Sequence, residues 1–336
     1  MRYAARMNNP EAGAHAAGTQ AAGSTPTHRP LGHSGPSVSA VGLGCNNFGG
    51  RLDQTATTAV VRRALDAGIT LFDTADIYGN RGGSEEMLGR ALGPERQNII
   101  LASKFGMDMG DGQQGARPEY IRRALEASLR RLGTDYLDLY QLHTPDPHTP
   151  IEDTLGTLND LVQQGLVRAI GVSNMPAADV RAADALAHQH GWARFTSCQD
   201  EHSLLVRDIE TDLIPAAHDL NLGLLPYFPL ASGLLTGKYH AGQPLPDGAR
   251  ITGSQGAQDR YLTAQNWTVV ENLRTFAQGQ GHTLLELAFS WLLSFPETSS
   301  VIAGATRPEQ IDANVAAATW TLTADERAEV DRITHG

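Results

Sequence analysis

The sequence contains very little cysteine and no long hydrophobic run. Its two cysteines, Cys45 and Cys198, are far apart and show no CxxC spacing, so neither a disulfide framework nor a thiolate zinc site is indicated. No apolar run approaches the roughly 18 residues of a transmembrane helix, and no apolar segment follows Arg2 and Arg6 at the N-terminus. We therefore expect a protein of the reducing cytoplasm that is neither secreted nor membrane-spanning.

Positive charge is also scarce. The 26 Lys and Arg residues face 37 Asp and Glu residues, which gives a formal net charge of −11. Binding to nucleic acid without sequence preference requires a positive face, so we expect no nucleic-acid partner, although a local basic pocket is compatible with this charge. The apolar fraction of 41% over 336 residues is enough for the core of one large domain.

The N-terminal part of the chain differs from the rest in composition. Residues 1–36 are rich in Ala, Gly, Thr, Ser, Pro and His and contain almost nothing aromatic, so they have little to bury against the entropy cost of ordering. We predict a disordered extension at 1–36, whose histidines bind no metal, followed by a single domain at 37–336.

From Val38 onward, short apolar runs alternate with helix-like segments. The expected strands are 39–45, 69–72, 98–103, 136–142, 167–172, 195–199, 222–227 and 300–303. The expected helices are 54–67, 84–92, 118–132, 151–164, 176–190, 208–220, 263–279, 283–293 and 308–318. About eight strand–helix units predict an α/β fold, a closed parallel (β/α)8 TIM barrel with a long loop, 230–261, after strand 7. The competing open sheet is disfavoured because the segment after the first strand lacks the third glycine of a dinucleotide-binding fingerprint.

Polar residues end three consecutive predicted strands, namely Asp73, Lys104 and His143. Reactive residues of such barrels lie at the carboxyl ends of the strands, and neighbouring strands are about 4.8 Å apart, so these side chains should converge. Tyr78 follows Asp73 in a loop and can fold back over them. A phenol has a pKa of about 10, which a nearby ammonium lowers. The set predicts a general acid aimed at a carbonyl, with Asp73 holding Lys104 charged and His143 bonding the carbonyl oxygen.

Each of these residues alone has an ordinary structural interpretation. Asp73 could cap a helix, Tyr78 could be an aromatic residue of a loop, and Lys104 could be a solvated strand end. His143 could be a histidine whose hydrogen bonds are all made within the protein. Their conjunction at the ends of consecutive strands favours catalysis. Asp76, between Asp73 and Tyr78, is expected to be a loop residue without a role in the mechanism. The glycine-rich segment 106–115 is either a mobile lid or a linker.

Several longer stretches carry a family resemblance that spans nearly all of the chain from Val38. They read FDTADIYGNRGGSEEMLGRAL, LASKFG, SLRRLGTDYLDLYQLHTPDP, GLVRAIGVSN, PLASGLLTGKY and AGATRPEQIDAN. In them the chain resembles the aldo-keto reductases, (β/α)8-barrel oxidoreductases that use NAD(P)H. The resemblance implies Tyr78 as the proton donor, Lys104 and Asp73 as its tuners, and His143 as the residue that orients the carbonyl.

The resemblance also implies a cofactor site. The matching positions are Ser173, Asn174, Gln199, Tyr227, Leu234, Gly237, Lys238, Arg250, Gly304, Thr306, Arg307, Gln310 and Asn314. The first three would hold the nicotinamide carboxamide and the next would stack on its ring. The segment around Lys238 would cross the pyrophosphate, Arg250 would be a second cation for a 2′-phosphate, and the last five would bind the adenosine end. NADPH is favoured over NADH, and no metal is expected.

The resulting expectation is NADPH-dependent reduction of a small aldehyde or ketone, possibly derived from a sugar. Two alternatives remain open at this point. One is an NAD(P)+-dependent dehydrogenase of a sugar or polyol hydroxyl, and the other is a slow-turnover, cofactor-binding regulatory subunit. The sequence does not identify the substrate or the oligomeric state, because loop residues vary freely on a fixed scaffold.

Overall fold

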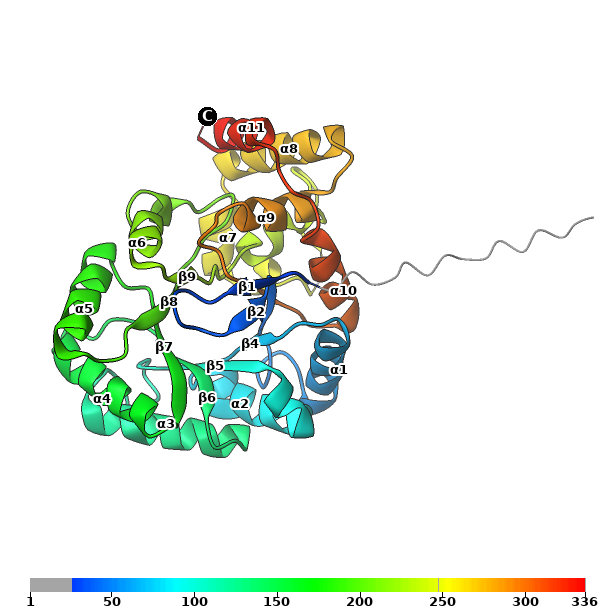
Figure 1. The fold of residues 1–336 in the computed structure, drawn as a ribbon. Helices are drawn as coiled ribbons and strands as arrows, with labels where there is room; N and C mark the ends of the chain where they lie inside the picture. The colour runs from blue at the N-terminus through cyan, green and yellow to red at the C-terminus, as the bar shows by residue number, and fades with distance from the viewer. Residues whose placement is uncertain (1–25, 247, 336) are drawn as a thin grey trace, which may run out of the picture.

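The computed structural model describes residues 26–246 and 248–335. Eight parallel strands form the central sheet, in the order β10–β3–β4–β5–β6–β7–β8–β9 (Figure 1). Their bounds are β3 (Val41–Gly44), β4 (Leu71–Asp73), β5 (Ile100–Phe105), β6 (Leu137–Leu142), β7 (Val167–Ser173), β8 (Phe195–Gln199), β9 (Gly223–Leu224) and β10 (Val301–Gly304). The sheet curves round as in a (β/α)8 barrel, which confirms the predicted α/β class.

Backbone hydrogen bonds also connect the two ends of this strand order. The Leu224 N–H donates to the Glu297 carbonyl at 2.7 Å, and the Ser299 N–H donates to the Leu224 carbonyl at 2.9 Å. These bonds join β9 to the chain segment just before β10.

Helices surround the sheet on its outer side (Figure 1). Their bounds are α1 (Gln54–Asp66), α2 (Tyr78–Leu92), α3 (Pro118–Leu132), α4 (Ile151–Gln163), α5 (Ala177–His190), α6 (Leu213–Leu220), α7 (Gln255–Tyr261), α8 (Ala264–Gly279), α9 (Leu284–Leu293), α10 (Pro308–Ala317) and α11 (Ala324–His335). In α1, the Asp53 carboxylate caps the first turn by accepting from the Ala56 N–H at 2.8 Å. Val60, Val61 and Ala64 of α1 are fully buried, so the helical period predicted from the sequence is the period of burial.

The expectation of disorder was wrong for the last part of the segment 1–36. Strand β1 (His28–Pro30) pairs antiparallel with β2 (Ser37–Ser39), and Leu31 between them is fully buried. Arg29 donates at 2.8 Å to the carbonyl of Leu293, the last residue of α9, and so satisfies a helix-end acceptor. Composition alone missed these backbone partners. Residues 1–25 lie outside the described residues.

The segment 230–261, predicted as a long loop after strand 7, contains short helical pieces. They are η3 (Ala231–Thr236), η4 (Ile251–Gly253) and α7. Ser254 caps α7 by accepting from the Ala257 N–H at 3.3 Å, and Tyr261 is 2% exposed. Local capping and the two buried rings of Tyr239 and Tyr261 therefore give structure to a segment that has no long apolar period.

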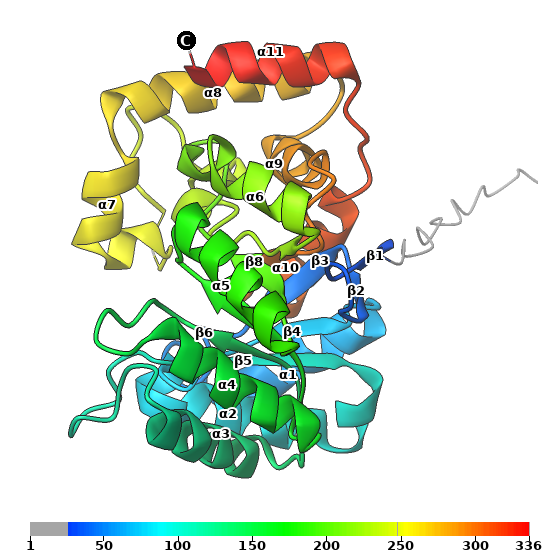
Figure 2. The same ribbon diagram turned by 60° about the vertical axis from the view of Figure 1, so that its left-hand side comes forward.

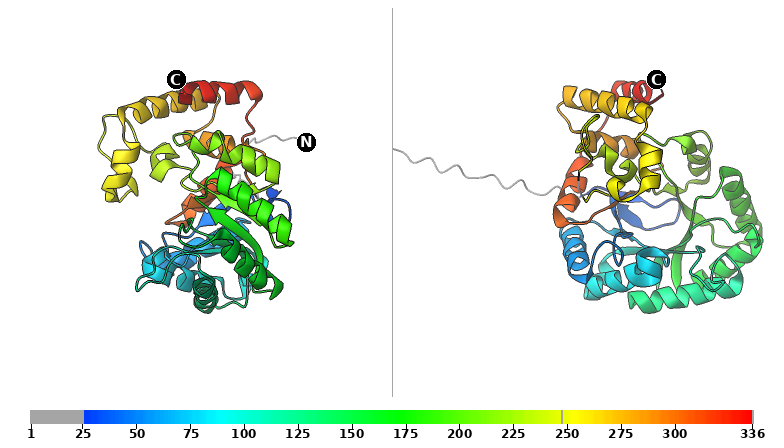
Figure 3. Two further views of the ribbon diagram at one scale, coloured as in Figure 1. Left: turned by 90° about the vertical axis from the view of Figure 1, so that its left-hand side faces the viewer. Right: turned by 180° about the vertical axis from the view of Figure 1, so that it is seen from behind.

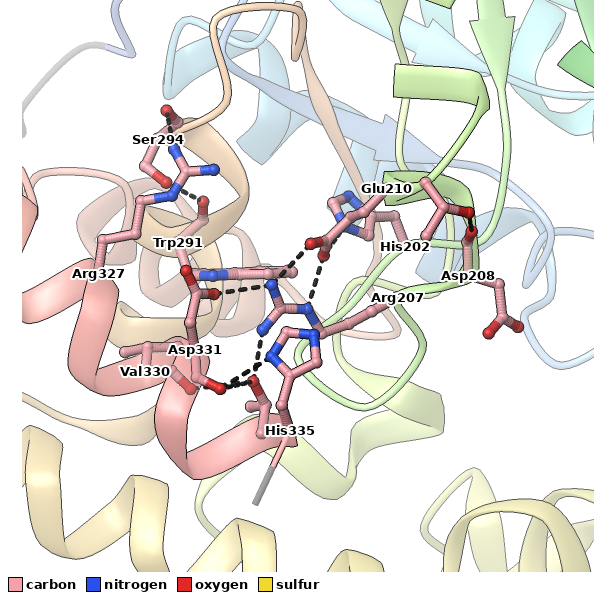
Figure 4. Close-up of polar contacts among 12 residues, drawn as sticks. His202, Arg207, Asp208, Glu210, Trp291, Ser294, Arg327, Val330, Asp331 and His335 are labelled. Carbon is pink, nitrogen blue, oxygen red and sulfur yellow. Dashed lines mark hydrogen bonds and ion pairs between the residues drawn. The ribbon is translucent and has the colours of Figure 1, made fainter. Parts of the chain in front are cut away.

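Helix α11 was not predicted. It lies alongside α8 (Figures 2 and 3), and Arg207, next to η2 (Asp208–Glu210), anchors it to the chain that follows β8. The Arg207 guanidinium contacts Glu210 at 2.6 Å and Asp331 of α11 at 2.7 Å (Figure 4). The docking of this helix depends on partners distant in the sequence. In the described part of the chain, no helix is long and apolar enough to cross a membrane.

Candidate active site

A buried ion pair joins the ends of β4 and β5. The Lys104 Nζ donates to Asp73 Oδ2 at 2.7 Å and to the Thr74 carbonyl at 3.0 Å, and Lys104 is fully buried. The other carboxylate oxygen of Asp73 accepts from the amides of Gln141 at 3.3 Å and Gln199 at 3.0 Å. Burial acts to lower the pKa of Lys104, but the combined effects of Asp73 and Tyr78 raise it above its ordinary value. Lys104 is therefore held as an ammonium ion.

The phenol ring of Tyr78 lies over this pair. The Lys104 Nζ is 5.1 Å from the centroid of the Tyr78 ring, and the His143 ring meets it edge-on at a centroid distance of 5.6 Å. The sequence led us to expect a lowered phenol pKa. Burial instead raises the pKa of Tyr78, and although the charge of Lys104 acts to lower it, the net direction is upward. Tyr78 is therefore a protonated phenol, able to donate.

His143 is held neutral beside them. Burial, together with the nearby charge of Lys104, lowers its pKa to about 3. Its backbone N–H donates to the Phe105 carbonyl at 2.8 Å, while the buried Nδ1 atom has no hydrogen-bond partner among the described residues. A neutral imidazole has one N–H donor and one acceptor, so this ring can donate to a carbonyl oxygen without transferring its proton.

A left-handed turn follows Tyr78. Gly79, Asn80, Arg81 and Gly82 all have positive φ, which costs energy at Asn80 and Arg81 because they carry a Cβ atom. At Gly79 a Cβ atom would lie 2.4 Å from the Phe48 carbonyl oxygen, so only glycine fits there. The right-handed part of α2 begins after this turn, which agrees with the helix expected from residue 84.

A cavity of about 740 Å³ runs from these residues toward α10. The predicted site residues that line it are Asp73, Tyr78, His143, Ser173, Asn174, Gln199, Tyr227, Lys238, Arg250, Gly304, Thr306, Arg307, Gln310 and Asn314. Leu234 and Gly237 do not line it, and Leu234 is fully buried in the core. Lys104 lies behind Asp73 and Tyr78. Most of the residues singled out from the sequence thus share one cavity.

The end of the cavity near Tyr78 has a connected set of polar side chains. The Ser173 hydroxyl donates to the Gln199 carbonyl at 2.7 Å, and the Asn174 amide nitrogen donates to Ser173 Oγ at 3.0 Å. The Tyr227 hydroxyl donates to Asn174 Oδ1 at 2.8 Å. Asn174 has a φ of 57°, a conformation that asparagine tolerates better than most residues. These bonds orient amide groups and an aromatic face beside the Tyr78 end.

The cavity also holds four cations, Arg51, Lys238, Arg250 and Arg307. None of them forms an ion pair with any residue in the described ranges 26–246 and 248–335. Burial lowers the pKa of Lys238, and the charges of Arg307 and Arg51 lower it further. Like charges without acidic partners favour an anionic ligand such as a phosphate group.

The far end of the cavity lies at the start of α10. Thr306 donates from its backbone N–H at 2.7 Å and from its hydroxyl at 3.1 Å to Gln310 Oε1. Pro308 occupies the first turn of α10, where free backbone N–H groups favour an anion. Asn314, one turn further, is 5% exposed. This end offers amide groups and a helix N-terminus to a nucleotide.

A model of the aldo/keto reductase family matches residues 40–335. The chain belongs to the aldo/keto reductase family. Members of this family generally catalyse NAD(P)H-dependent reduction of carbonyl compounds.

Sequence reasoning missed several residues that line the cavity of this aldo/keto reductase, and they are Asn46, Asn47, Arg51 and Phe228. Arg51 donates to the Gly248 carbonyl at 3.1 Å and so connects the loop after β3 to the segment between η3 and η4. The sequence signal for it was weak, because an arginine in a loop is ordinarily solvated.

Asp76 lies in the turn between β4 and α2, so its expected position in a loop is confirmed, but it is buried rather than solvated. Asp76 is 1% exposed, and its backbone N–H donates to the Lys104 carbonyl at 3.1 Å. Its Oδ1 atom has no partner within the described part of the chain, and burial raises its pKa to about 7, with the charge of Glu85 acting in the same direction. This aldo/keto reductase therefore carries a second buried acid next to the Tyr78 turn. Among the described residues, no group of three His, Cys, Asp or Glu residues could hold a metal ion.

Proposed function

We propose that this protein catalyses NADPH-dependent reduction of an aldehyde or ketone to the alcohol, with Tyr78 as the general acid. The observation that carries the proposal is the placement of a protonated Tyr78 and a neutral His143 over the buried Asp73–Lys104 pair. These groups lie at one end of a cavity that is also lined by Arg51, Lys238, Arg250 and Arg307. The arrangement suits proton donation to a carbonyl oxygen.

The proton donation follows from the residues of the chain. A bound NADPH supplies hydride to the carbonyl carbon. The Tyr78 hydroxyl gives its proton to the carbonyl oxygen, on which negative charge develops, and His143 donates a hydrogen bond to the same oxygen. The Lys104 ammonium stabilises the phenolate left on Tyr78, since an adjacent positive charge favours the ionised form. Asp73 keeps Lys104 charged and in place.

The cavity residues support binding of NADPH in particular. Ser173, Asn174 and Gln199 would hold the nicotinamide carboxamide, and Tyr227 would stack on the ring. The cluster of four cavity cations would bind the pyrophosphate and the 2′-phosphate. Arginine and lysine without acidic partners bind phosphate through charge-assisted hydrogen bonds. Gln310 and Asn314 would bind the adenine end.

The test is the variant Tyr78→Phe, with Tyr136→Phe as the matched control. Loss of a general acid costs about 10²- to 10⁴-fold in rate. We therefore expect the turnover of every carbonyl substrate to decrease by about this factor when it is monitored through NADPH absorbance. The affinity for NADPH should stay close to that of the wild type. Tyr136, which packs against Arg96 and Arg168, should be replaceable without this loss. Near-normal rates in Tyr78→Phe would rule out the assigned acid.

We also propose that the sheet closes into a complete barrel within a single domain, and that the domain expected at 37–336 extends back to include β1 (His28–Pro30). The backbone hydrogen bonds that Leu224 makes with Glu297 and Ser299 support closure. A cytoplasmic location and a small-molecule carbonyl or sugar-derived substrate remain predictions from the sequence. Fractionation of cells and a carbonyl panel would test them.

A further inference from the structure

On one side of the catalytic residues, the surrounding loops contribute almost nothing to the cavity lining. This lining comes from the chain after β3, β4 and β7 to β10, and the loops after β5 and β6 contribute only His143. Loops at the carboxyl ends of barrel strands surround the active site. The loops that follow Lys104 and His143 are therefore available to a substrate, while the proposed cofactor would occupy the cavity on the opposite side.

The loop after β5 forms an ordered hairpin. The Gly115 N–H donates to the Gly106 carbonyl at 2.9 Å, and the Met109 N–H donates to the Gln113 carbonyl at 2.9 Å. The loop projects from the body of the molecule and is drawn in turquoise (Figure 2). A Cβ atom on Gly110 would lie 3.6 Å from the Arg81 guanidinium. The tip of this loop therefore contacts the turn that follows Tyr78.

One carboxylate holds the base of this hairpin. Asp146 Oδ2 accepts from the Ala116 N–H at 2.8 Å and from the Thr149 hydroxyl at 2.7 Å, and Oδ1 accepts from the His148 N–H at 2.9 Å. Burial acts to raise the pKa of Asp146, but these hydrogen bonds lower it below its ordinary value. Asp146 is therefore a carboxylate that joins the loop after Lys104 to the loop after His143.

The fit around Asp146 is close. Gly115 has a φ of 84°, and a Cβ atom there would lie 2.5 Å from Asp146 Oδ2. A side chain at this position would displace the carboxylate, so the glycine and the aspartate form a matched pair. The segment 106–116 is consequently fixed at its base by Asp146 and meets Arg81 at its tip, and it connects the chain segments that follow Tyr78, Lys104 and His143.

We propose that Asp146 is a positioning residue for substrate binding. It fixes the 106–116 hairpin over the catalytic end of the barrel, so that the carbonyl substrate meets an ordered wall. The proposal rests on the carbonyl reduction proposed above. A carboxylate that served stability alone would affect cofactor affinity, turnover and substrate affinity together, whereas a positioning role on the substrate side changes KM for the carbonyl.

The experiment compares Asp146→Ala and Asp146→Asn with the wild-type protein. Asp146→Ala removes all three hydrogen bonds, and we expect KM for the carbonyl to rise about tenfold, since charge-assisted hydrogen bonds are the stronger class. NADPH affinity, followed by quenching of protein fluorescence, should stay unchanged. Asn retains one acceptor oxygen, so Asp146→Asn should give an intermediate KM. Amide hydrogen exchange should become faster in 106–116 in both variants.

Asp212→Ala is the matched control. Asp212 also accepts from a backbone N–H, that of Leu213 at 2.6 Å, at the start of α6, a helix that contributes no residue to the cavity. We expect this variant to leave the carbonyl KM unchanged.

An unchanged KM in Asp146→Ala, or an equal loss of NADPH affinity and substrate affinity, would overturn the positioning role. Failure of the proposed function can be distinguished from failure of the positioning role, because the wild-type protein would then show no carbonyl reduction. In that case hydrogen exchange still decides whether Asp146 holds the hairpin. Faster exchange in 106–116 supports the anchoring, and unchanged exchange overturns it.

Discussion

Replacing Lys104 with methionine should separate the effect of the buried ion pair on stability from its proposed role in catalysis. Lys104 is fully buried and Asp73 is 3% exposed. In Lys104→Met, a side chain of similar length fills the space, but the Asp73 carboxylate loses the ammonium at 2.7 Å. The remaining donors to Asp73 are the amides of Gln141 and Gln199.

The expected size of the effect follows from these contacts. Removing one partner of a buried ion pair costs about 3–5 kcal/mol, because the other charge is left uncompensated. The two glutamine amides still satisfy Asp73 Oδ1, so we expect the lower end, about 3 kcal/mol. Typical domains unfold with a free energy of about 5–15 kcal/mol, so the variant should remain folded at room temperature.

The double variant Asp73→Asn with Lys104→Met tests the cause of the loss. An asparagine at 73 keeps an oxygen that accepts from Gln141 and Gln199, and no charge remains buried. Most of the lost free energy of unfolding should therefore return. Neither variant should recover turnover, because both lack the ammonium that stabilises the Tyr78 phenolate.

Urea unfolding at neutral pH, monitored by circular dichroism, measures both variants against the wild type. Carbonyl reduction is measured on the same samples. A loss of less than about 1 kcal/mol in Lys104→Met would refute the reasoning. A double variant no more stable than Lys104→Met would refute it as well, since the buried charge would then not be the source of the instability.

Three further predictions concern other buried or cavity-lining charges. The pKa of Asp76 is raised to about 7 in the folded protein, so its stabilising contribution is complete below the unfolded pKa of about 4 and is lost as pH rises through 7. Asp76→Asn should therefore gain in Tm relative to the wild type between pH 5 and pH 8, and a pH-independent difference would contradict this. Arg51→Met should weaken NADPH binding without changing the carbonyl KM at saturating cofactor, as measured by fluorescence titration and steady-state kinetics. Arg207→Met should lower Tm by leaving Glu210 and Asp331 without their shared cation, whereas Arg332→Met, at an exposed pair, should leave Tm unchanged.

The periodic elements could be predicted from local sequence because burial follows the same period as the side chains. The helix expected at 118–132 is found at those bounds, with Pro at its start and Gly133 in the left-handed conformation after its end. The strands ending at Asp73 and near Lys104 and His143 were placed within a few residues. In a parallel barrel, strand ends meet at one rim, so the convergence of Asp73, Lys104 and His143 also followed from the sequence.

Other features depended on partners far away in the chain. The hairpin of β1 and β2 is held by contacts of Arg29 with the chain around α9, and no composition argument identifies such partners. The pKa of Tyr78 was expected to fall because of Lys104, but burial outweighs that charge. Burial is a property of the folded molecule, so its size could not be known beforehand.

By itself, the sequence determined the strand–helix alternation, the polar residues at the strand ends and the family to which the chain belongs, because each of these is written in local order along the chain. The tertiary structure alone decided that Arg51 joins the other cavity cations, that Asp76 is a buried acid, and that Asp146 ties two loops together. These depend on which atoms meet across long sequence separations, where desolvation and hydrogen-bond geometry set the energies.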